Sequence, residues 1–417
     1  MLLLPALFIL IIAKSWSLFS VNSLLVILAA VYSVKNLLLD DWKTNPVRLS
    51  WMDLAPLMVA GVEVLNYLMS TYRPNTLPYV VDAFFLSLFY YLVRFNLRSD
   101  KQKLVLFVCI TIFAVVLSGA SLFNELPTLF GRLKSLGFSD LTDFRYLIRL
   151  ANRTGSSIVE WATIYLLFLP YPLILFLRNR GGGWKSWLLL GPVLLVLVAI
   201  FLSFSRGIYA AVIVFFLVGS ILFHGYSLSS WRKILVFDVI VFLCLAIVLL
   251  PVIRPVLTTI TGFRTSAQVR SFEGRREVWS QSLGMTKDHL LFGVGTNNFA
   301  MHYMGHRQQS DESVLVAGAH NLFLQLLIEK GLVGLLAYCL LFFIFFLTSH
   351  RKIKLSGAAV YKKGVIILFM TTVAAAIVRD FSYYSILTNA GVSVLLWFMF
   401  AHNAQLEGDL EEATDEN

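Results

Sequence analysis

Charged residues are scarce in this sequence. Asp, Glu, Lys and Arg make up 14% of its 417 residues, whereas soluble domains carry about a quarter. Hydrophobic residues make up 58%, and the mean hydropathy is +0.77. This composition excludes an ordinary soluble protein. Apolar runs of roughly 17–25 residues, the length needed to cross about 30 Å of hydrocarbon, recur along the chain. The sequence therefore predicts a membrane protein whose scaffold lies in the bilayer.

Cysteine is also rare. Cys109, Cys244 and Cys339 all lie in apolar runs, so the exposed loops have no thiols to pair and we expect no structural disulfide. The long outer loops have no acidic pair suited to a metal, because "DE" at Asp311 and Glu312 is typical of a solvated turn. We therefore expect no metal, no cofactor and no nucleic-acid partner.

Hydropathy predicts an all-α polytopic fold of about twelve transmembrane helices. The first run, Met1 to Ala13, lacks the charged start and the cleavage site of a signal peptide, so we interpret it as a retained span. The predicted spans lie near residues 2–13, 18–34, 51–70, 79–94, 104–123, 158–178, 187–204, 207–224, 234–252, 321–347, 364–378 and 384–402.

Lys and Arg concentrate in alternate short loops, as at Lys101 and Lys103 or at Arg351 and Lys352. The side that carries them is predicted to be cytoplasmic, and both termini face it. We expect residues 1–402 to form a single transmembrane domain. The acidic segment 403–417 is predicted to be a disordered cytoplasmic tail.

Two long connections, residues 124–157 and 253–319, fall on the outer side and are expected to contain short helices. Both are rich in arginine. This positive charge could attract the loops to anionic lipid headgroups, with a binding free energy of about 1 kcal/mol per basic residue. It could instead bind a phosphate-bearing substrate, because an arginine can donate two hydrogen bonds to one phosphate group. Composition leaves both explanations open.

In the first loop, "DFRYLIRLANR" spaces three arginines four residues apart, on one face of a helix. This face suits a second wall of an anionic site or an interfacial helix. The arginines are Arg145, Arg149 and Arg153.

Another pattern, "LSFSRGIYAAV", places Arg206 between two apolar runs, at a predicted outer turn. A charge beside hydrocarbon is expensive, so Arg206 is either a snorkelling turn residue or a binding residue. Gly207 beside it would let a ligand approach the backbone.

The stretch "EGRREVWSQSLGMTKDHLLFGVGTNNF", Glu273 to Phe299, predicts an amphipathic surface helix followed by a glycine-rich turn. Arg275 and Arg276 are expected in its first turn. Taken alone, these glycines and asparagines indicate a turn more often than a phosphate cradle.

The stretch "GAHNLFLQLLIEKGLVG" contains His320-Asn321, nine residues, Gly331, two residues and Gly334. A lone histidine at the start of a span is usually a packing residue, and an asparagine there often caps the helix. A histidine also suits a general base near neutral pH. Asn321 could instead orient the imidazole or a substrate that accepts a transferred group.

These patterns, in this order, resemble those of bacterial O-antigen ligases and the related lipid-linked polysaccharide polymerases. The resemblance implies a metal-independent, inverting glycosyltransferase of the GT-C type. Its donor would be a glycan on undecaprenyl diphosphate, and its acceptor lipid A-core or a second lipid-linked glycan. By the same resemblance, Arg206 and Arg276 would engage the diphosphate and His320 would serve the acceptor, with Arg275 and Asn321 adjacent.

The chemistry of these residue types agrees. Diphosphate leaves readily once its charge is neutralised, and positioned arginines can do this without a metal. Ligation on the periplasmic face is our first expectation, and polymerisation of repeat units is the alternative. A lipid-linked sugar transporter would predict paired repeats with broken helices, and protein O-glycosylation an added domain; neither is evident.

Ionisable residues in or beside spans suggest function by default. Glu329 and Lys330 could contact the acceptor path or pair with other polar groups inside the bundle. We place none of them in the core site. They are Asp53, Glu63, Asp82, Glu160, Glu329 and Lys330.

Overall fold

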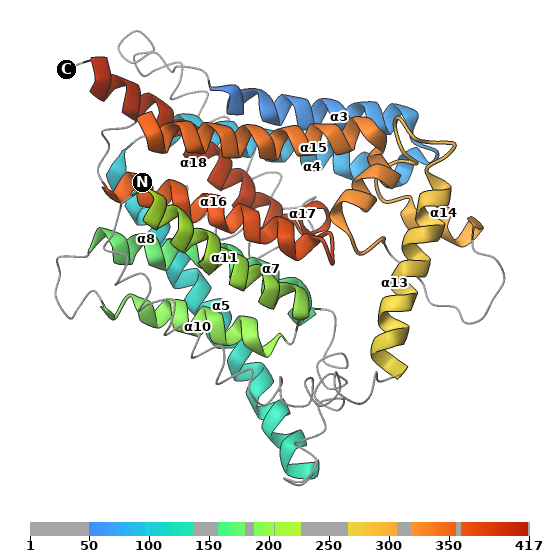
Figure 1. The fold of residues 1–417 in the computed structure, drawn as a ribbon, viewed down its shortest axis with the longest axis horizontal. Helices are drawn as coiled ribbons and strands as arrows, with labels where there is room; N and C mark the ends of the chain where they lie inside the picture. The colour runs from blue at the N-terminus through green and yellow to red at the C-terminus, as the bar shows by residue number, and fades with distance from the viewer. Residues whose placement is uncertain are drawn as a thin grey trace. The chain divides into compact units, whose positions relative to one another are not determined.

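The computed structural model describes residues 50–97, 99–136, 157–179, 187–203, 205–226, 266–306, 318–355 and 360–415 (Figure 1). Every regular element in these ranges is a helix. Seven helices there are long and apolar enough to cross a membrane: Trp51–Met69, Arg73–Asn96, Asp100–Phe123, Trp161–Arg178, Gly207–Gly225, Leu322–Lys354 and Val360–Asp380. The all-helical polytopic class is thereby confirmed.

These seven helices coincide with predicted spans. The predicted run 187–204 forms a shorter apolar helix, α10 (Leu190–Leu202). The predicted run 384–402 begins with a short helix, α17 (Ser385–Thr388), before α18 (Ala390–Asp415). The predicted spans at 2–13, 18–34 and 234–252 lie outside the described residues, so the number twelve stays a prediction.

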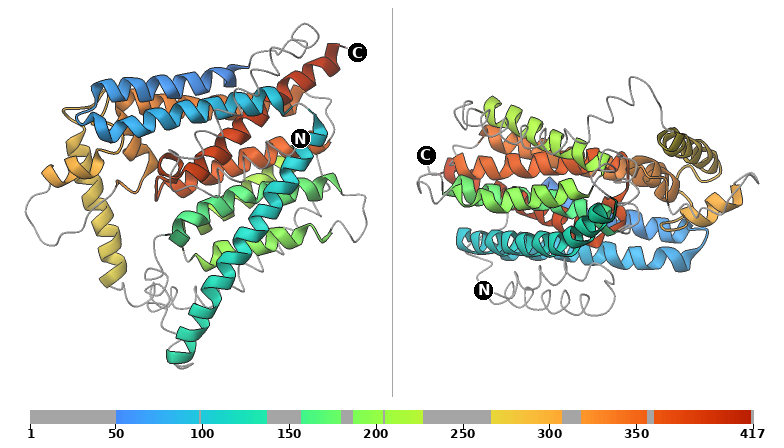
Figure 2. Two further views of the ribbon diagram at one scale, coloured as in Figure 1. Left: turned by 180° about the vertical axis from the view of Figure 1, so that it is seen from behind. Right: turned by 90° about the horizontal axis from the view of Figure 1, so that it is seen from below.

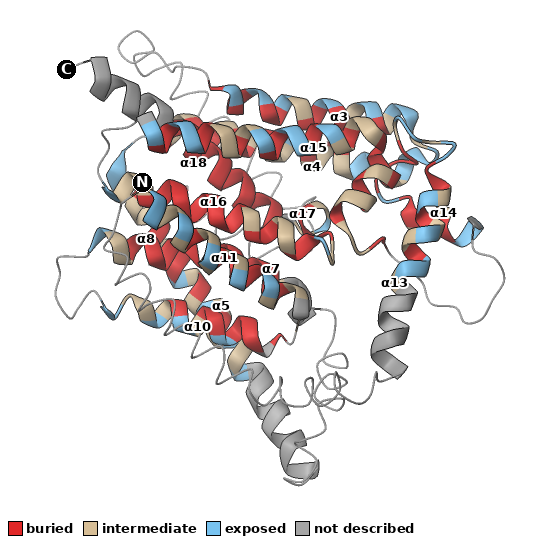
Figure 3. Cartoon of the chain, viewed as in Figure 1, coloured by how far each residue is buried: buried red, intermediate tan, exposed pale blue. Residues whose placement is uncertain are grey.

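The chain forms two compact units. The first comprises residues 1–106, 275–366 and 380–417, and the second comprises 107–274 and 367–379. In the first unit, α3 (Ala55–Met69) packs beside α4 (Arg73–Asn96), and α4 packs against α18 (Figure 2). The long helix α15 (Leu322–Leu355) lies along α3. Their facing sides are the buried ones (Figure 3).

One end of α3 is fixed by the 3-10 helix η1 (Trp51–Leu54). The Asp53 carboxylate accepts a hydrogen bond from the backbone of Ser50 at 2.7 Å and forms an ion pair with Arg94 Nε at 3.1 Å. The hydroxyl of Tyr90 donates to it as well, at 2.8 Å. Asp53, one of the ionisable groups noted in the sequence, therefore joins η1 to α4.

The second unit is built on α7 (Ser157–Phe168) and α8 (Pro170–Arg178). Proline begins α8 because it needs no backbone donor in the first turn of a helix. Both α10 and α11 (Arg206–Gly225) pack against α7. Helices α5 (Asp100–Leu136), α13 (Ser266–Met285) and α16 (Val360–Asp380) have residues in both units.

Three boundaries differ from the sequence prediction. Helix α5 continues to Leu136, past its apolar run and into the predicted first outer loop. Helix α18 continues to Asp415, so the tail predicted to be disordered is largely helical, because Leu, Glu and Ala are strong helix formers. Helix α13 begins at Ser266, so the prediction that Arg275 and Arg276 lie in a first turn was wrong: both lie mid-helix.

Candidate functional site

His320 lies directly before α15, in a short segment with an unusual backbone. Its φ is 48°, in the left-handed region that few residues other than glycine adopt and where histidine is enriched. The ring is half-buried beside Tyr383 and Tyr384, with ring centroids 5.9 and 6.0 Å apart. Gly318 packs so closely on Tyr384 that an added Cβ would lie 2.3 Å from that ring. The segment that carries His320 is thus tightly fitted.

Polar contacts hold both neighbours of His320. Asn321 caps α15, because its Oδ1 accepts from the backbone of Leu324 at 3.0 Å, and its Nδ2 donates to the Phe381 carbonyl at 3.2 Å. The backbone of Ala319 donates to Gln325 Oε1 at 2.7 Å. Of the interpretations open for Asn321, the structure shows the cap.

A hydrogen bond joins helix α13 to this segment. The indole of Trp279 donates to the carbonyl of Ala319, the residue before His320, at 2.8 Å. Arg275 and Arg276 lie one turn earlier on the same helix; Arg276 is exposed and Arg275 is half-buried. Trp279 therefore joins the helix that carries the arginine pair to the segment that carries His320.

The residues around this bond form a small core of their own. Val278 and Met285 of α13 pack with Val294 of the glycine-rich turn and with Phe299, which begins α14 (Phe299–His306). Ile328 of α15 completes it. Leu283 of the same helix is 51% exposed and lies outside this core.

The other predicted site residues are placed differently. Arg206 is the first residue of α11, after the turn at Ser205, and belongs to the second unit. Its side chain is not among the described positions. Arg145, Arg149 and Arg153 lie outside the described residues.

The helix α15 is broken at Gly331, the first glycine of the histidine motif. Gly331 has φ 66° and ψ −166°, a conformation essentially limited to glycine. A Cβ there would lie 2.3 Å from the Leu291 backbone, and a Cβ at Gly293 would lie 2.3 Å from the Glu329 backbone. At Gly334, a Cβ would meet the Lys330 side chain at 2.2 Å. Gly331 and Gly293 therefore let two chain segments touch, whereas Gly334 leaves room for the Lys330 side chain of its own helix.

Those two segments are joined through their backbones. The N–H groups of Val294 and Gly295 donate to the carbonyls of Ile328 and Glu329, both at 2.9 Å. Past the break, the N–H of Leu332 donates to the Leu290 carbonyl at 2.8 Å. These bonds satisfy backbone groups that the interrupted helix leaves unpaired.

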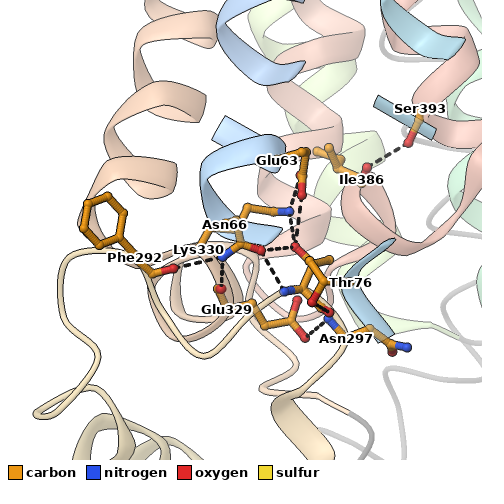
Figure 4. A network of polar contacts seen from close by, with 10 residues as sticks. Glu63, Asn66, Thr76, Phe292, Asn297, Glu329, Lys330, Ile386 and Ser393 are labelled. Carbon is orange, nitrogen blue, oxygen red and sulfur yellow. Dashed lines mark hydrogen bonds and ion pairs between the residues drawn. The ribbon is translucent and has the colours of Figure 1, made fainter. Parts of the chain in front are cut away.

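Polar side chains reinforce the junction (Figure 4). Lys330 Nζ forms a buried ion pair with Glu63 of α3 and donates to Thr296 Oγ1 at 2.7 Å. The Asn66 amide donates to the Glu329 carbonyl at 2.6 Å and accepts from the Thr296 backbone at 2.8 Å. The network attaches the glycine-rich turn and the broken helix to α3.

Glu329 belongs to the same junction, since its Oε1 accepts from the backbone of Asn297 at 3.0 Å. Glu329 thus pairs with the Asn297 backbone and Lys330 with Glu63. Pairing with other polar groups was one of the two interpretations that the sequence left open. Sequence reasoning did not select Trp279, Gln325, Asn66 or Thr296. Asn66 and Gln325 had a visible signal, because each is an amide within an apolar run.

Among the described residues, no group of three or more His, Cys, Asp or Glu side chains could hold a metal ion. The described residues include an exposed arginine, Arg276, and a half-buried histidine, His320. A hydrogen bond from Trp279 to Ala319 joins the segments that carry them. Such groups can neutralise an anion and accept a proton.

The fold and site together define a polytopic helical membrane protein with a histidine segment at the start of a broken span. A family model described as O-antigen ligase matches residues 191–339. The match confirms the resemblance to the O-antigen ligase superfamily, and its range includes Arg206, Arg275, Arg276, His320 and Asn321. No curated protein matches the sequence.

At the level of this family, the match supports an enzyme of the glycosyltransferase kind, with glycan transfer of the ligase or polymerase type. It likewise supports lipid-linked glycans as partners and the bilayer as the setting.

Proposed function

We propose that this protein transfers a preassembled glycan from undecaprenyl diphosphate to an acceptor sugar on the periplasmic face of the inner membrane. The first choice of acceptor is lipid A-core, which makes the protein an O-antigen ligase. Residues 1–402 form the catalytic domain, and the segment from 403 faces the cytoplasm.

The observation that carries this proposal is the bond between Trp279 and Ala319. It joins the helix of Arg276, which suits a diphosphate, to the backbone beside His320, which suits an acceptor hydroxyl. A buried packing histidine would need neither the exposed arginine nor the left-handed backbone. The O-antigen ligase match over both segments gives independent support.

The proposed reaction is a single inverting displacement. The acceptor oxygen bonds to the anomeric carbon while the bond from that carbon to the diphosphate oxygen breaks. The diphosphate leaves with the electron pair, and Arg276 neutralises its charge. His320 takes the proton of the acceptor hydroxyl. Undecaprenyl diphosphate is the second product.

A deletion strain distinguishes this function from polymerisation. If the protein is a ligase, its loss should leave bare lipid A-core together with free lipid-linked polymer in the lipopolysaccharide banding pattern. If lipid A-core instead carries a single repeat unit in that strain, the protein is a polymerase. Complementation with the wild-type chain should restore the full ladder.

Arg276→Ala should lower the transfer rate roughly 10- to 100-fold, because a charge-assisted hydrogen bond contributes about 1.5–3 kcal/mol. Arg276→Lys should recover little of it, since lysine cannot grip two phosphate oxygens at once. The rate is measured with purified protein and lipid-linked donor.

Arg351→Ala serves as the matched control, because Arg351 is exposed at the end of α15 predicted to be cytoplasmic. It should retain the wild-type rate. A wild-type rate in Arg276→Lys would contradict two-oxygen contact at this position.

A further inference from the structure

The first unit contains a cavity separate from the arginine pair. Its volume is about 390 Å³, within the range of small-molecule sites, roughly 300–1,000 Å³. Residues of α3, α4, α15, α17 and α18 line it, together with Asn297 of the glycine-rich turn. The elements that hold the broken helix thus also enclose this space.

Four polar side chains that line the cavity have no hydrogen bond or ion pair to any described residue. They are the carboxylate of Asp82, the hydroxyls of Tyr79 and Tyr338, and the indole N–H of Trp397. Trp397 is only 6% exposed. A buried indole N–H usually finds a partner, and unpaired polar groups away from bulk water are costly. A hydroxyl-bearing ligand would supply the missing partners.

The charge of the lining argues against phosphate. Glu63 is paired with Lys330, so the unpaired carboxylate of Asp82 leaves the cavity negative. The aromatic side chains of Tyr79, Tyr338 and Trp397 also line the cavity. Apolar faces with a few placed polar groups suit a sugar ring, which has C–H faces and hydroxyl edges. The cavity is therefore chemically opposite to an arginine site for diphosphate.

The wall of the cavity reaches the histidine segment. Ile386, Leu387 and Thr388 of α17 line the cavity. Tyr384, directly before α17, lies beside His320 with ring centroids 6.0 Å apart. The start of α17 is fixed by Asp380, whose carboxylate accepts from Ser385 Oγ and from the Ile386 backbone, both at 2.7 Å. One rigid turn thus connects His320 to the cavity.

We propose that this cavity is a binding site for an unphosphorylated sugar ring of the acceptor, held by Asp82, Tyr79, Tyr338 and Trp397. The proposal rests on the proposed function and adds where the acceptor is recognised. A sugar of the donor glycan would fit the same lining, so the lining does not by itself distinguish donor from acceptor. The connection through Tyr384 to His320, the group assigned to the acceptor hydroxyl, favours the acceptor.

The test uses the purified full-length protein with both substrates varied in turn. Asp82→Asn should raise the KM for lipid A-core roughly 10- to 100-fold, as expected for losing a hydrogen bond to a charged group. The KM for the lipid-linked donor should stay unchanged. Tyr338→Phe, which removes one oxygen only, should raise the acceptor KM less. Asp100→Asn, at an exposed carboxylate, is the matched control and should change neither constant.

A binding measurement keeps the two proposals separable. Lipid-free, dephosphorylated core oligosaccharide should bind the wild-type protein in titration calorimetry and bind Asp82→Asn at least tenfold more weakly. If the wild type transfers glycan but both variants keep the wild-type acceptor KM and oligosaccharide affinity, the cavity proposal is wrong and the proposed function stands. A rise in donor KM alone would overturn the acceptor assignment. Absence of transfer by the wild type would instead overturn the proposed function.

Discussion

His320→Ala should lower the rate of glycan transfer by about 10²- to 10⁴-fold, the usual contribution of a general base. The protein should still insert in the membrane and bind the lipid-linked donor, because the neighbouring contacts through Ala319 and Asn321 use other atoms. Transfer with purified protein is the direct measurement. His224→Ala, at an exposed histidine of α11, is the control and should retain full activity.

The left-handed backbone at His320 calls for a second variant. Asparagine favours the left-handed conformation, so His320→Asn should preserve the fold around φ 48° while removing the imidazole. It should be as inactive as His320→Ala. This separates the chemistry of the side chain from the strain of the backbone.

His320→Gln tests a pure hydrogen-bonding role, because glutamine donates and accepts but cannot take a proton at neutral pH. The wild-type rate should rise with pH, since only the neutral imidazole accepts a proton. A near-normal rate in His320→Gln with the same pH profile would make His320 a positioning residue.

Lys330→Met should destabilise the protein by about 3–5 kcal/mol, because it leaves the buried carboxylate of Glu63 without its ion-pair partner. It should also release Thr296 and so loosen the glycine-rich turn. Thermal unfolding in detergent measures the effect. Lys354→Met, at an exposed lysine of the same helix, is the matched control and should change stability little.

A double substitution isolates the pair. Adding Glu63→Gln to Lys330→Met removes the uncompensated charge, so part of the lost stability should return. Wild-type stability in Lys330→Met alone would show that the ion pair does not hold α15 to α3.

Hydropathy predicted the membrane helices well because hydrocarbon demands long apolar runs with their backbone bonds satisfied internally. The helix cap at Asn321 could also be predicted from the sequence, since asparagine directly before an apolar helix is a common N-cap residue. The same local rules failed at the tail. Acidic composition indicated disorder there, while the helix propensity of Leu, Glu and Ala extends α18 to Asp415.

The site itself depends on contacts that a sequence does not display. The motif marks Gly331 but does not show why it is glycine; the close approach of Leu291, 40 positions earlier, supplies the reason. Likewise, nothing local joins Trp279 to Ala319 or Asn66 to Glu329. These contacts depend on how residues far apart in the sequence come together around the broken helix α15.

Reconstituted transfer tests the central claim most directly. Purified protein is mixed with glycan on undecaprenyl diphosphate and with lipid A-core, in EDTA and without added metal. We expect the protein to form glycan-bearing lipid A-core and to release an equal amount of undecaprenyl diphosphate. His320→Ala should form neither product. Transfer that stops in EDTA and returns with magnesium or manganese, or equal transfer by His320→Ala, would contradict the arginine and histidine mechanism.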